Sequence, residues 1–79
     1  MIYVGIDVAK DKHDCFITNS DGEVLFKSFP ISNNREGFET LFQRIQSVSD
    51  DLSKVKVGLE ATGHYSYNLL GFLLDKGLT

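Results

Sequence analysis

The spacing of the apolar residues changes near residue 33, and this change restricts the folds that the chain can adopt. Before that point, short stretches either alternate apolar and polar residues or are rich in β-branched residues, as strands are. We predict strands over residues 2–7, 12–19 and 23–29. After that point, apolar residues recur at i, i+3, i+4 and i+7, which is typical of a helix with one buried face. These residues are Phe38, Leu41, Phe42, Ile45 and Val48. A three-stranded antiparallel meander is therefore expected to precede a helix.

Turn and cap signals set the limits of these elements. Residues 20–22, Ser-Asp-Gly, have the composition of a hairpin turn. Pro30 is expected to close the third strand, because proline cannot donate a hydrogen bond to a central ladder. Asn33 is followed three residues later by Glu36. This pair resembles a capping box and predicts that the helix starts near Asn34.

The second half of the chain adds one strand and one helix. A polar loop at 50–54 precedes a strand predicted over 55–60, and a second helix is predicted from about 65 to 76, with Gly77 as its C′ residue. The order βββαβα favours a right-handed crossover that places the fourth strand parallel to the first. The predicted fold is α/β with a mixed sheet. Because the chain stops at 78–79, where a further strand would begin, we expect a fold that is incomplete at its C-terminus.

Composition limits the class of protein. The 79 residues, 42% of them hydrophobic, suffice for one small domain. No apolar run reaches the roughly 18 residues of a membrane span, and the N-terminus lacks the basic start of a signal peptide. The single cysteine, Cys15, fits a reducing compartment, so we expect a cytoplasmic protein that does not bind membranes. The net charge of −3 argues against nucleic-acid binding by bulk electrostatics alone.

A repeated tripeptide marks the candidate site. Gly5-Ile6-Asp7 ends the first predicted strand, and residues 58–60, Gly-Leu-Glu, end the fourth. If these strands are parallel neighbours, the carboxylates of Asp7 and Glu60 emerge together at the carboxyl end of the sheet. Two adjacent carboxylates repel each other unless a cation or a proton lies between them, and hard oxygen ligands suit Mg²⁺ or Mn²⁺. The alternative is structural: Asp7 begins a turn and Glu60 is a solvated strand end.

Two blocks of sequence then resemble a known family. Gly-Ile-Asp-Val-Ala-Lys-Asp at 5–11 and Leu-Glu-Ala-Thr-Gly-His-Tyr at 59–65 are similar to the first two catalytic blocks of DEDD transposases of the insertion-sequence-110 type, which include the Piv-type DNA invertases. The resemblance implies that residues 1–79 are the N-terminal portion of an RNase H-like, RuvC-like catalytic domain. It also implies that the full-length protein is a transposase or site-specific DNA recombinase.

The same resemblance implies the chemistry of the site. Asp7 and Glu60 would be catalytic ligands of Mg²⁺ or Mn²⁺, and DNA would be the partner whose phosphodiesters are cleaved and rejoined. The family's last two aspartates and a serine used in strand transfer come later in its chain, and some members contact a guide RNA. We therefore expect this piece alone to be inactive and to bind Mg²⁺ weakly. We also expect a homo-oligomer, because an exposed sheet edge recruits other strands.

Five further residues are candidates for contact with nucleic acid because they follow the two acidic residues closely. They are Lys10, Lys12, Thr62, His64 and Tyr65. The lysines would meet the phosphate backbone, His64 would hydrogen-bond a phosphate or a serine, and Tyr65 would stack on a base or sugar. Each also has a structural explanation: a solvated hairpin charge, a helix cap at Thr62, or ordinary packing. Backbone N–H groups at a helix start also attract phosphate.

Two other classes of protein remain open from the sequence. Sugar kinases and actin-like ATPases also begin with an aspartate-bearing strand and a hairpin. Their hairpin needs glycine and Thr or Ser after the aspartate, where this chain has Ala9 and Lys10. A non-catalytic RNase H-like interaction module is the third possibility, and loss of the later acidic pair in the full-length chain would distinguish it.

Overall fold

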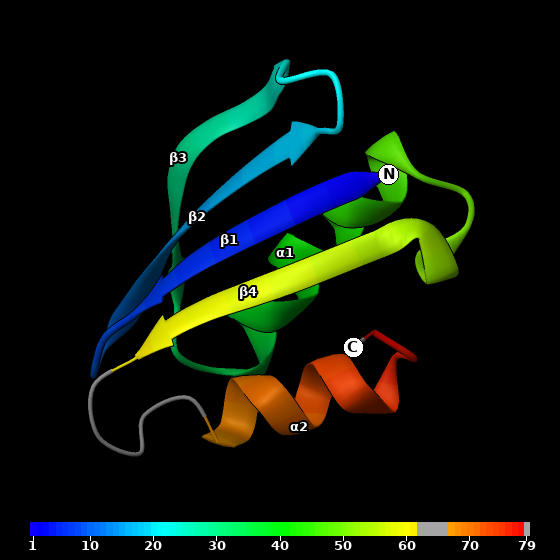
Figure 1. Ribbon diagram of the computed structural model, residues 1–79. Coiled ribbons are helices and arrows are strands. Elements are labelled where there is room, and N and C mark those ends of the chain that lie inside the picture. Colours follow the sequence, from blue (N-terminus) through cyan, green and yellow to red (C-terminus); the bar gives the residue numbers. More distant parts are fainter. Residues whose placement is uncertain (62–66, 79) are drawn as a thin grey trace.

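The computed structural model of the protein describes residues 1–61 and 67–78, which form a four-stranded sheet with two helices packed on one of its faces (Figure 1). The elements follow the predicted βββαβα order, with one added turn of 3-10 helix, η1. They are β1 (Ile2–Val8), β2 (Lys12–Asn19), β3 (Val24–Ser32), α1 (Arg35–Val48), η1 (Leu52–Lys54), β4 (Val55–Ala61) and α2 (Tyr67–Asp75). Neither helix in this part of the chain is long and apolar enough to cross a membrane.

The strands lie in the order β3-β2-β1-β4. β1 pairs antiparallel with β2, β2 pairs antiparallel with β3, and β1 pairs parallel with β4. The meander and the parallel crossover predicted from the sequence are therefore confirmed, and the mixed sheet fits an RNase H-like fold.

The core lies between the sheet and the two helices because each strand alternates its side chains between faces. On β1, for example, Val4, Ile6 and Val8 are buried while Asp7 is exposed. The other buried apolar residues come from β2, β3, β4, both helices and the short segment after α2. They are Cys15, Ile17, Phe29, Ile31, Phe38, Leu41, Ile45, Val55, Leu69, Leu73 and Leu78. The opposite face of the sheet carries no helix in the described structure.

The prediction that Pro30 ends the third strand is wrong. β3 continues to Ser32, with Pro30 opposite Asp14 of β2. The reason is topological: β3 is an edge strand of the sheet, and an edge strand tolerates a residue that has no N–H to donate.

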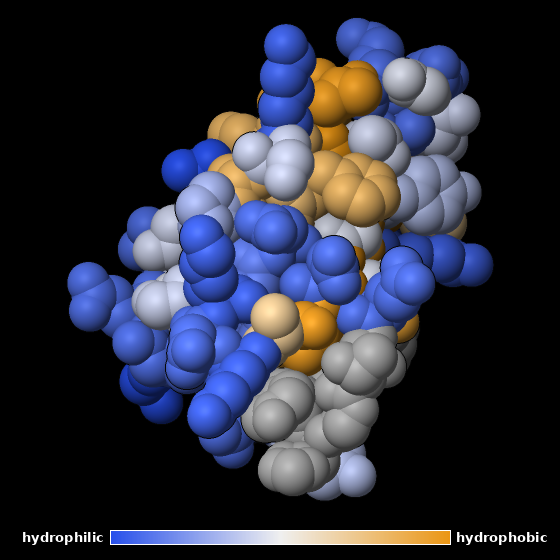
Figure 2. All heavy atoms as spheres, turned by 90° about the vertical axis from the view of Figure 1, so that its left-hand side faces the viewer, coloured by the Kyte–Doolittle hydropathy of each residue, from blue (hydrophilic) through white to orange (hydrophobic). Residues whose placement is uncertain are grey.

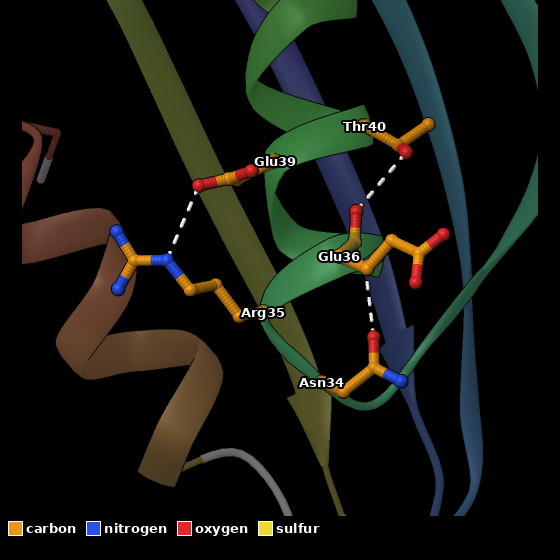
Figure 3. A network of polar contacts seen from close by, with 6 residues as sticks. Asn34, Arg35, Glu36, Glu39 and Thr40 are labelled. Atoms are coloured by element: carbon orange, nitrogen blue, oxygen red, sulfur yellow. Dashed lines mark hydrogen bonds and ion pairs between the residues drawn. The ribbon is translucent and has the colours of Figure 1, made fainter.

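Asn34 is the N-cap of α1. Its side-chain oxygen accepts a hydrogen bond from the backbone N–H of Gly37 at 2.9 Å. Figure 3 shows the Asn34 side chain at the start of the helix. On the exposed side of the same turns, Arg35 pairs with Glu39 at 3.2 Å. The start of the helix near Asn34 is thus confirmed, although the cap is one residue later than the predicted capping box places it.

Asn33 has a different function from the one the sequence suggests. Its side-chain amide donates to the carbonyl oxygen of Lys10 at 2.8 Å, and its backbone N–H donates to the carbonyl oxygen of Asp11 at 3.0 Å. Asn33 therefore ties the loop between β1 and β2 to the start of α1.

α2 ends as its sequence predicts. Gly77 has φ +85°, and its N–H donates to the carbonyl oxygen of Leu74 at 3.0 Å. The N–H of Leu78 donates to the carbonyl oxygen of Leu73 at 3.0 Å, and both leucines are buried. This is a Schellman motif with its usual apolar contact. The described part of the helix starts at Tyr67, and the predicted start at residue 65 lies outside the described residues.

Candidate active site

Asp7 and Glu60 are direct neighbours on parallel strands. In the register of β1 with β4, Asp7 lies beside Glu60 and Gly5 lies beside Gly58. Both carboxylates are exposed, on the sheet face that the helices leave uncovered. Adjacent strands lie about 4.8 Å apart, so the two side chains leave the sheet close together. The predicted side-by-side arrangement is confirmed.

The two acidic residues lie at the end of the molecule where β1 and β4 both finish. In Figure 1 these strands point toward the same side, and Figure 2 looks onto that side, where most of the described side chains are hydrophilic. A shallow hollow of about 270 Å³ opens on the sheet there. It is lined by Gly5, Ile6, Asp7, Phe16, Gly58, Leu59 and Glu60.

The two glycines of the hollow differ in their surroundings. A Cβ added at Gly58 would have no heavy atom within 4 Å, so the space above this residue is open. A Cβ added at Gly5 would overlap the ring of Phe16, which lies across β1 at this point. The hollow therefore has a bare backbone floor at Gly58 and an aromatic ring over Gly5.

A third carboxylate, which the sequence alone does not mark, lies beside Asp7 on the neighbouring strand β2. Asp14 of β2 is the cross-strand partner of Asp7, so it projects from the same face of the sheet. Residues opposite each other in a hairpin share a face, but the register that pairs Asp14 with Asp7 is known only from the structure. Even so, no three His, Cys, Asp or Glu side chains among the described residues are close enough together to hold a metal ion.

The pair formed by Asp7 and Glu60 fits one part of a divalent-cation site. Like charges on neighbouring strands destabilise a sheet unless they are compensated, and a cation compensates both at once. Carboxylate oxygens are ligands that Mg²⁺ accepts, and this ion usually takes only one or two carboxylates and completes its shell with water and substrate phosphates. The donor set and the open hollow are consistent with that chemistry.

The predicted nucleic-acid contacts fall into two groups. Lys10 lies in the β1–β2 loop and Lys12 begins β2, and both are exposed. They are therefore free to meet a charged ligand approaching the end of β1. Thr62, His64 and Tyr65 lie outside the residues that the structure describes.

His13 holds the loop that carries Lys10. Its ring is fully buried, and Nδ1 accepts a hydrogen bond from the backbone N–H of Ala9 at 3.1 Å. The ring stacks on Phe38 of α1, with 6.3 Å between the ring centroids. Together with Asn33, His13 fixes the backbone that follows Asp7, so its contribution here is structural.

Cys15 has the properties of a buried structural residue. It is fully buried on β2, and burial, with a smaller contribution from the neighbouring Asp14 carboxylate, raises the pKa of its thiol to about 12. Because the thiolate is the reactive form, the thiol is unreactive at neutral pH in the folded protein.

We therefore expect Cys15 to resist alkylation by iodoacetamide at pH 8 in the native protein and to react once denaturant exposes it and returns its pKa toward the ordinary value. Mass spectrometry after short pulses of reagent measures the modified fraction at this residue. Equal rates of modification in native and denaturing buffer would contradict the burial of this thiol.

Comparison with known proteins shows the family of this chain. A family model for DEDD transposases of the IS110 type, described as a transposase, matches residues 4–79. The chain is also 38% identical over 64 residues to the pilin gene-inverting protein of Moraxella lacunata. That match covers 80% of this chain and 19% of the relative, so the chain spans about a fifth of the relative's length. The chain belongs to the family of IS110-type DEDD transposases.

Proposed function

We propose that Asp7 and Glu60 are two of the acidic residues with which the intact protein holds Mg²⁺ or Mn²⁺ while it cleaves and rejoins DNA phosphodiesters. The observation that carries this proposal is the pairing of Asp7 with Glu60 on parallel strands. The family match supports the coarser part, a DNA transposase or recombinase. The relative that inverts a pilin gene supports a reaction on DNA in which strands are exchanged.

The two acidic residues have different places in the proposed site. Asp7 lies on β1, between β2 and β4, so its carboxylate occupies the middle of the row, while Glu60 is on the β4 side. In this proposal Asp7 is the central ligand and Glu60 holds a cation from one side. A bound divalent cation supplies charge stabilisation at the phosphoryl group and at the attacking and leaving oxygens.

The chain's own groups position the substrate. The strands hold both carboxylates on rigid backbone, and the bare backbone at Gly58 leaves room for a phosphodiester to approach them. Lys10 and Lys12 contact the DNA backbone beside the site in this proposal, and each neutralised phosphate would add salt-dependent affinity.

The rest of the active site must come from other segments if the protein resembles its relatives in length. The proposal accordingly includes the family's further aspartates and its strand-transfer serine as the remaining catalytic groups. It also includes a homo-oligomer that acts in the cytoplasm and, as in some members of the family, binds a guide RNA. It favours a recombinase over a sugar kinase or actin-like ATPase, because both comparisons are with proteins of DNA rearrangement.

Metal dependence tests this function. Intact protein is incubated with DNA under EDTA, Mg²⁺, Mn²⁺ or Ca²⁺, and new strand junctions are counted by sequencing, which detects them at any target site. We expect junctions with Mg²⁺ and Mn²⁺ and none with EDTA. DNA binding measured in the same buffers serves as the control for general loss of function. Junction formation in EDTA at the rate seen with Mg²⁺ would overturn the proposal.

A further inference from the structure

The face of the sheet that the helices leave uncovered is organised in three rows across β2, β1 and β4. The rows follow from the two registers of β1, and each contains three residues that share this face. The first row is Thr18, Tyr3 and Lys56; the second is Phe16, Gly5 and Gly58; the third is Asp14, Asp7 and Glu60. The aromatic side chain of Phe16 thus lies in the row next to the carboxylates, on the same open surface.

Phe16 places a large apolar side chain on this open face of the sheet. Its side chain is 48% exposed although it is apolar and belongs to a central strand. The ring lies across Gly5, so one side of it covers the backbone of β1. Covering a strand glycine with an aromatic ring is a known way to stabilise a sheet. That explanation accounts for the side of the ring that meets the sheet and leaves the exposed side without a partner.

The exposed ring also borders the hollow that contains the two acidic residues. Phe16, Gly58, Asp7 and Glu60 all line it. The aromatic row and the acidic row are two residues apart along β1, which is about 7 Å at the rise of a strand. A ligand whose flat apolar part and phosphate are about 7 Å apart, as the base and phosphate of a nucleotide are, could place the apolar part on Phe16 and the phosphate at the acidic row.

We infer that Phe16 is a stacking platform for a DNA base, namely the base of a nucleotide whose phosphate lies at Asp7 and Glu60. The inference rests on the proposed function, because it uses the carboxylates as the place of the phosphate. Every base has a π-face, so stacking of this kind is tolerant of sequence.

The charge of the chain favours this kind of contact. With a net charge of −3 and three carboxylates on the face, the described surface cannot hold DNA by electrostatics alone. Stacking does not depend on net charge, and Lys56 in the first row offers a cation on the side of Phe16 away from the acidic row. An anionic lipid surface fits this face less well than DNA, because it would be repelled by the same carboxylates and has no base to stack on Phe16.

The test is a binding and crosslinking experiment on the intact protein. Binding of a short single-stranded DNA is measured by fluorescence anisotropy for the wild type, Phe16→Leu and Phe16→Tyr. Ca²⁺ is present, because a phosphate can lie at Asp7 and Glu60 only when a cation separates the like charges. Leucine keeps an apolar cover over Gly5 but cannot stack, and tyrosine keeps the ring. We expect affinity to fall about 10-fold for Phe16→Leu and to stay within about 2-fold for Phe16→Tyr, since one base–aromatic stack is worth about that much.

A second readout locates the contact. The same DNA with iodouracil in place of thymine is irradiated, and crosslinks are mapped by mass spectrometry. We expect a crosslink at residue 16 in the wild type and in Phe16→Tyr, and its loss in Phe16→Leu. Gly5→Ala is a further variant: its methyl group would push the ring aside without altering the ring itself, and it should lower both signals. Val24→Ala is the matched control, because Val24 is an exposed apolar residue of β3 that does not line the hollow.

The outcomes separate this inference from the function on which it rests. If Phe16→Leu binds and crosslinks like the wild type while Asp7→Asn blocks recombination, Phe16 is only a cover for Gly5 and the inference is wrong. If Asp7→Asn and Glu60→Gln recombine DNA normally, the proposed function is wrong whatever Phe16 does. Loss of affinity in Val24→Ala equal to that in Phe16→Leu would also overturn the inference.

Discussion

Asp7→Asn or Glu60→Gln is expected to lower the recombination rate of the intact protein by about 100-fold or more while leaving the fold unchanged. Each amide is nearly isosteric with the carboxylate but lacks the charge that would hold a cation. Removing one group that stabilises charge in a transition state typically costs about 100- to 1,000-fold in rate. Both side chains are exposed, so neither substitution disturbs the core.

Folding stability separates a lost function from a lost structure. Each substitution removes one of three like charges on neighbouring strands, so without metal the free energy of unfolding should stay the same or rise slightly, by less than about 1 kcal/mol. Thermal unfolding in EDTA measures this directly. With Mg²⁺ present, the wild type should gain stability from binding and the variants should gain less.

Asp21→Asn is the matched control for the loss of one negative charge. Asp21 is exposed in the turn between β2 and β3, at the end of β2 opposite to Asp14, and it does not line the hollow. Recombination by this variant should equal that of the wild type. Normal recombination by both Asp7→Asn and Glu60→Gln would instead favour the non-catalytic interaction module.

The elements and the acidic pair were predictable because they depend on local patterns. Strand alternation on β1 and β4 assigns each residue to a face, and the β-helix-β crossover makes the strands parallel. The matched tripeptides that end in Asp7 and Glu60 suggest the register as well, and the pairing of Asp7 with Glu60 confirms it. The resemblance to the family added their chemical role, which the sheet by itself does not give.

The features that were missed depend on pairing across the meander. Whether Phe16 covers Gly5 and whether Asp14 faces Asp7 are set by the register of β2 against β1, which a one-residue change would reverse. Pro30 was misjudged because its tolerance depends on β3 being an edge strand, a property of the whole sheet. Asn33 contacts a loop far earlier in the chain, at Lys10, beyond the range of a local cap rule.

Gly37→Ala is expected to destabilise the protein although alanine is the better helix former. Gly37 is buried in the first turn of α1, and a Cβ there would overlap backbone atoms of Ser32, including its carbonyl oxygen. Ser32 ends β3 and pairs with Lys12, so this backbone cannot turn aside as a flexible side chain could. Overpacking of this kind costs about 1–3 kcal/mol, and a clash with backbone belongs at the upper end of that range.

The opposing effect is helix propensity, which can be measured in the same protein. Replacing glycine by alanine inside a helix gains about 1 kcal/mol, so the net loss for Gly37→Ala is about 2 kcal/mol. Gly71→Ala is the matched control, because Gly71 lies within α2 and an added Cβ would have no heavy atom within 4 Å. This second variant should be more stable than the wild type by about 0.5–1 kcal/mol.

Thermal unfolding followed by circular dichroism should therefore give changes of opposite sign for the two glycines. In a domain of this size, the expected shifts in Tm are a fall of about 10 °C for Gly37→Ala and a rise of about 4 °C for Gly71→Ala. If both variants were stabilised, propensity would dominate at both sites, and the close contact of α1 with the end of β3 would be wrong. That contact matters for the site, because the segment joining β3 to α1 also carries Asn33, which holds the loop after Asp7 through Lys10. A shift of α1 away from Ser32 should therefore loosen the loop beside the carboxylates as well as the core.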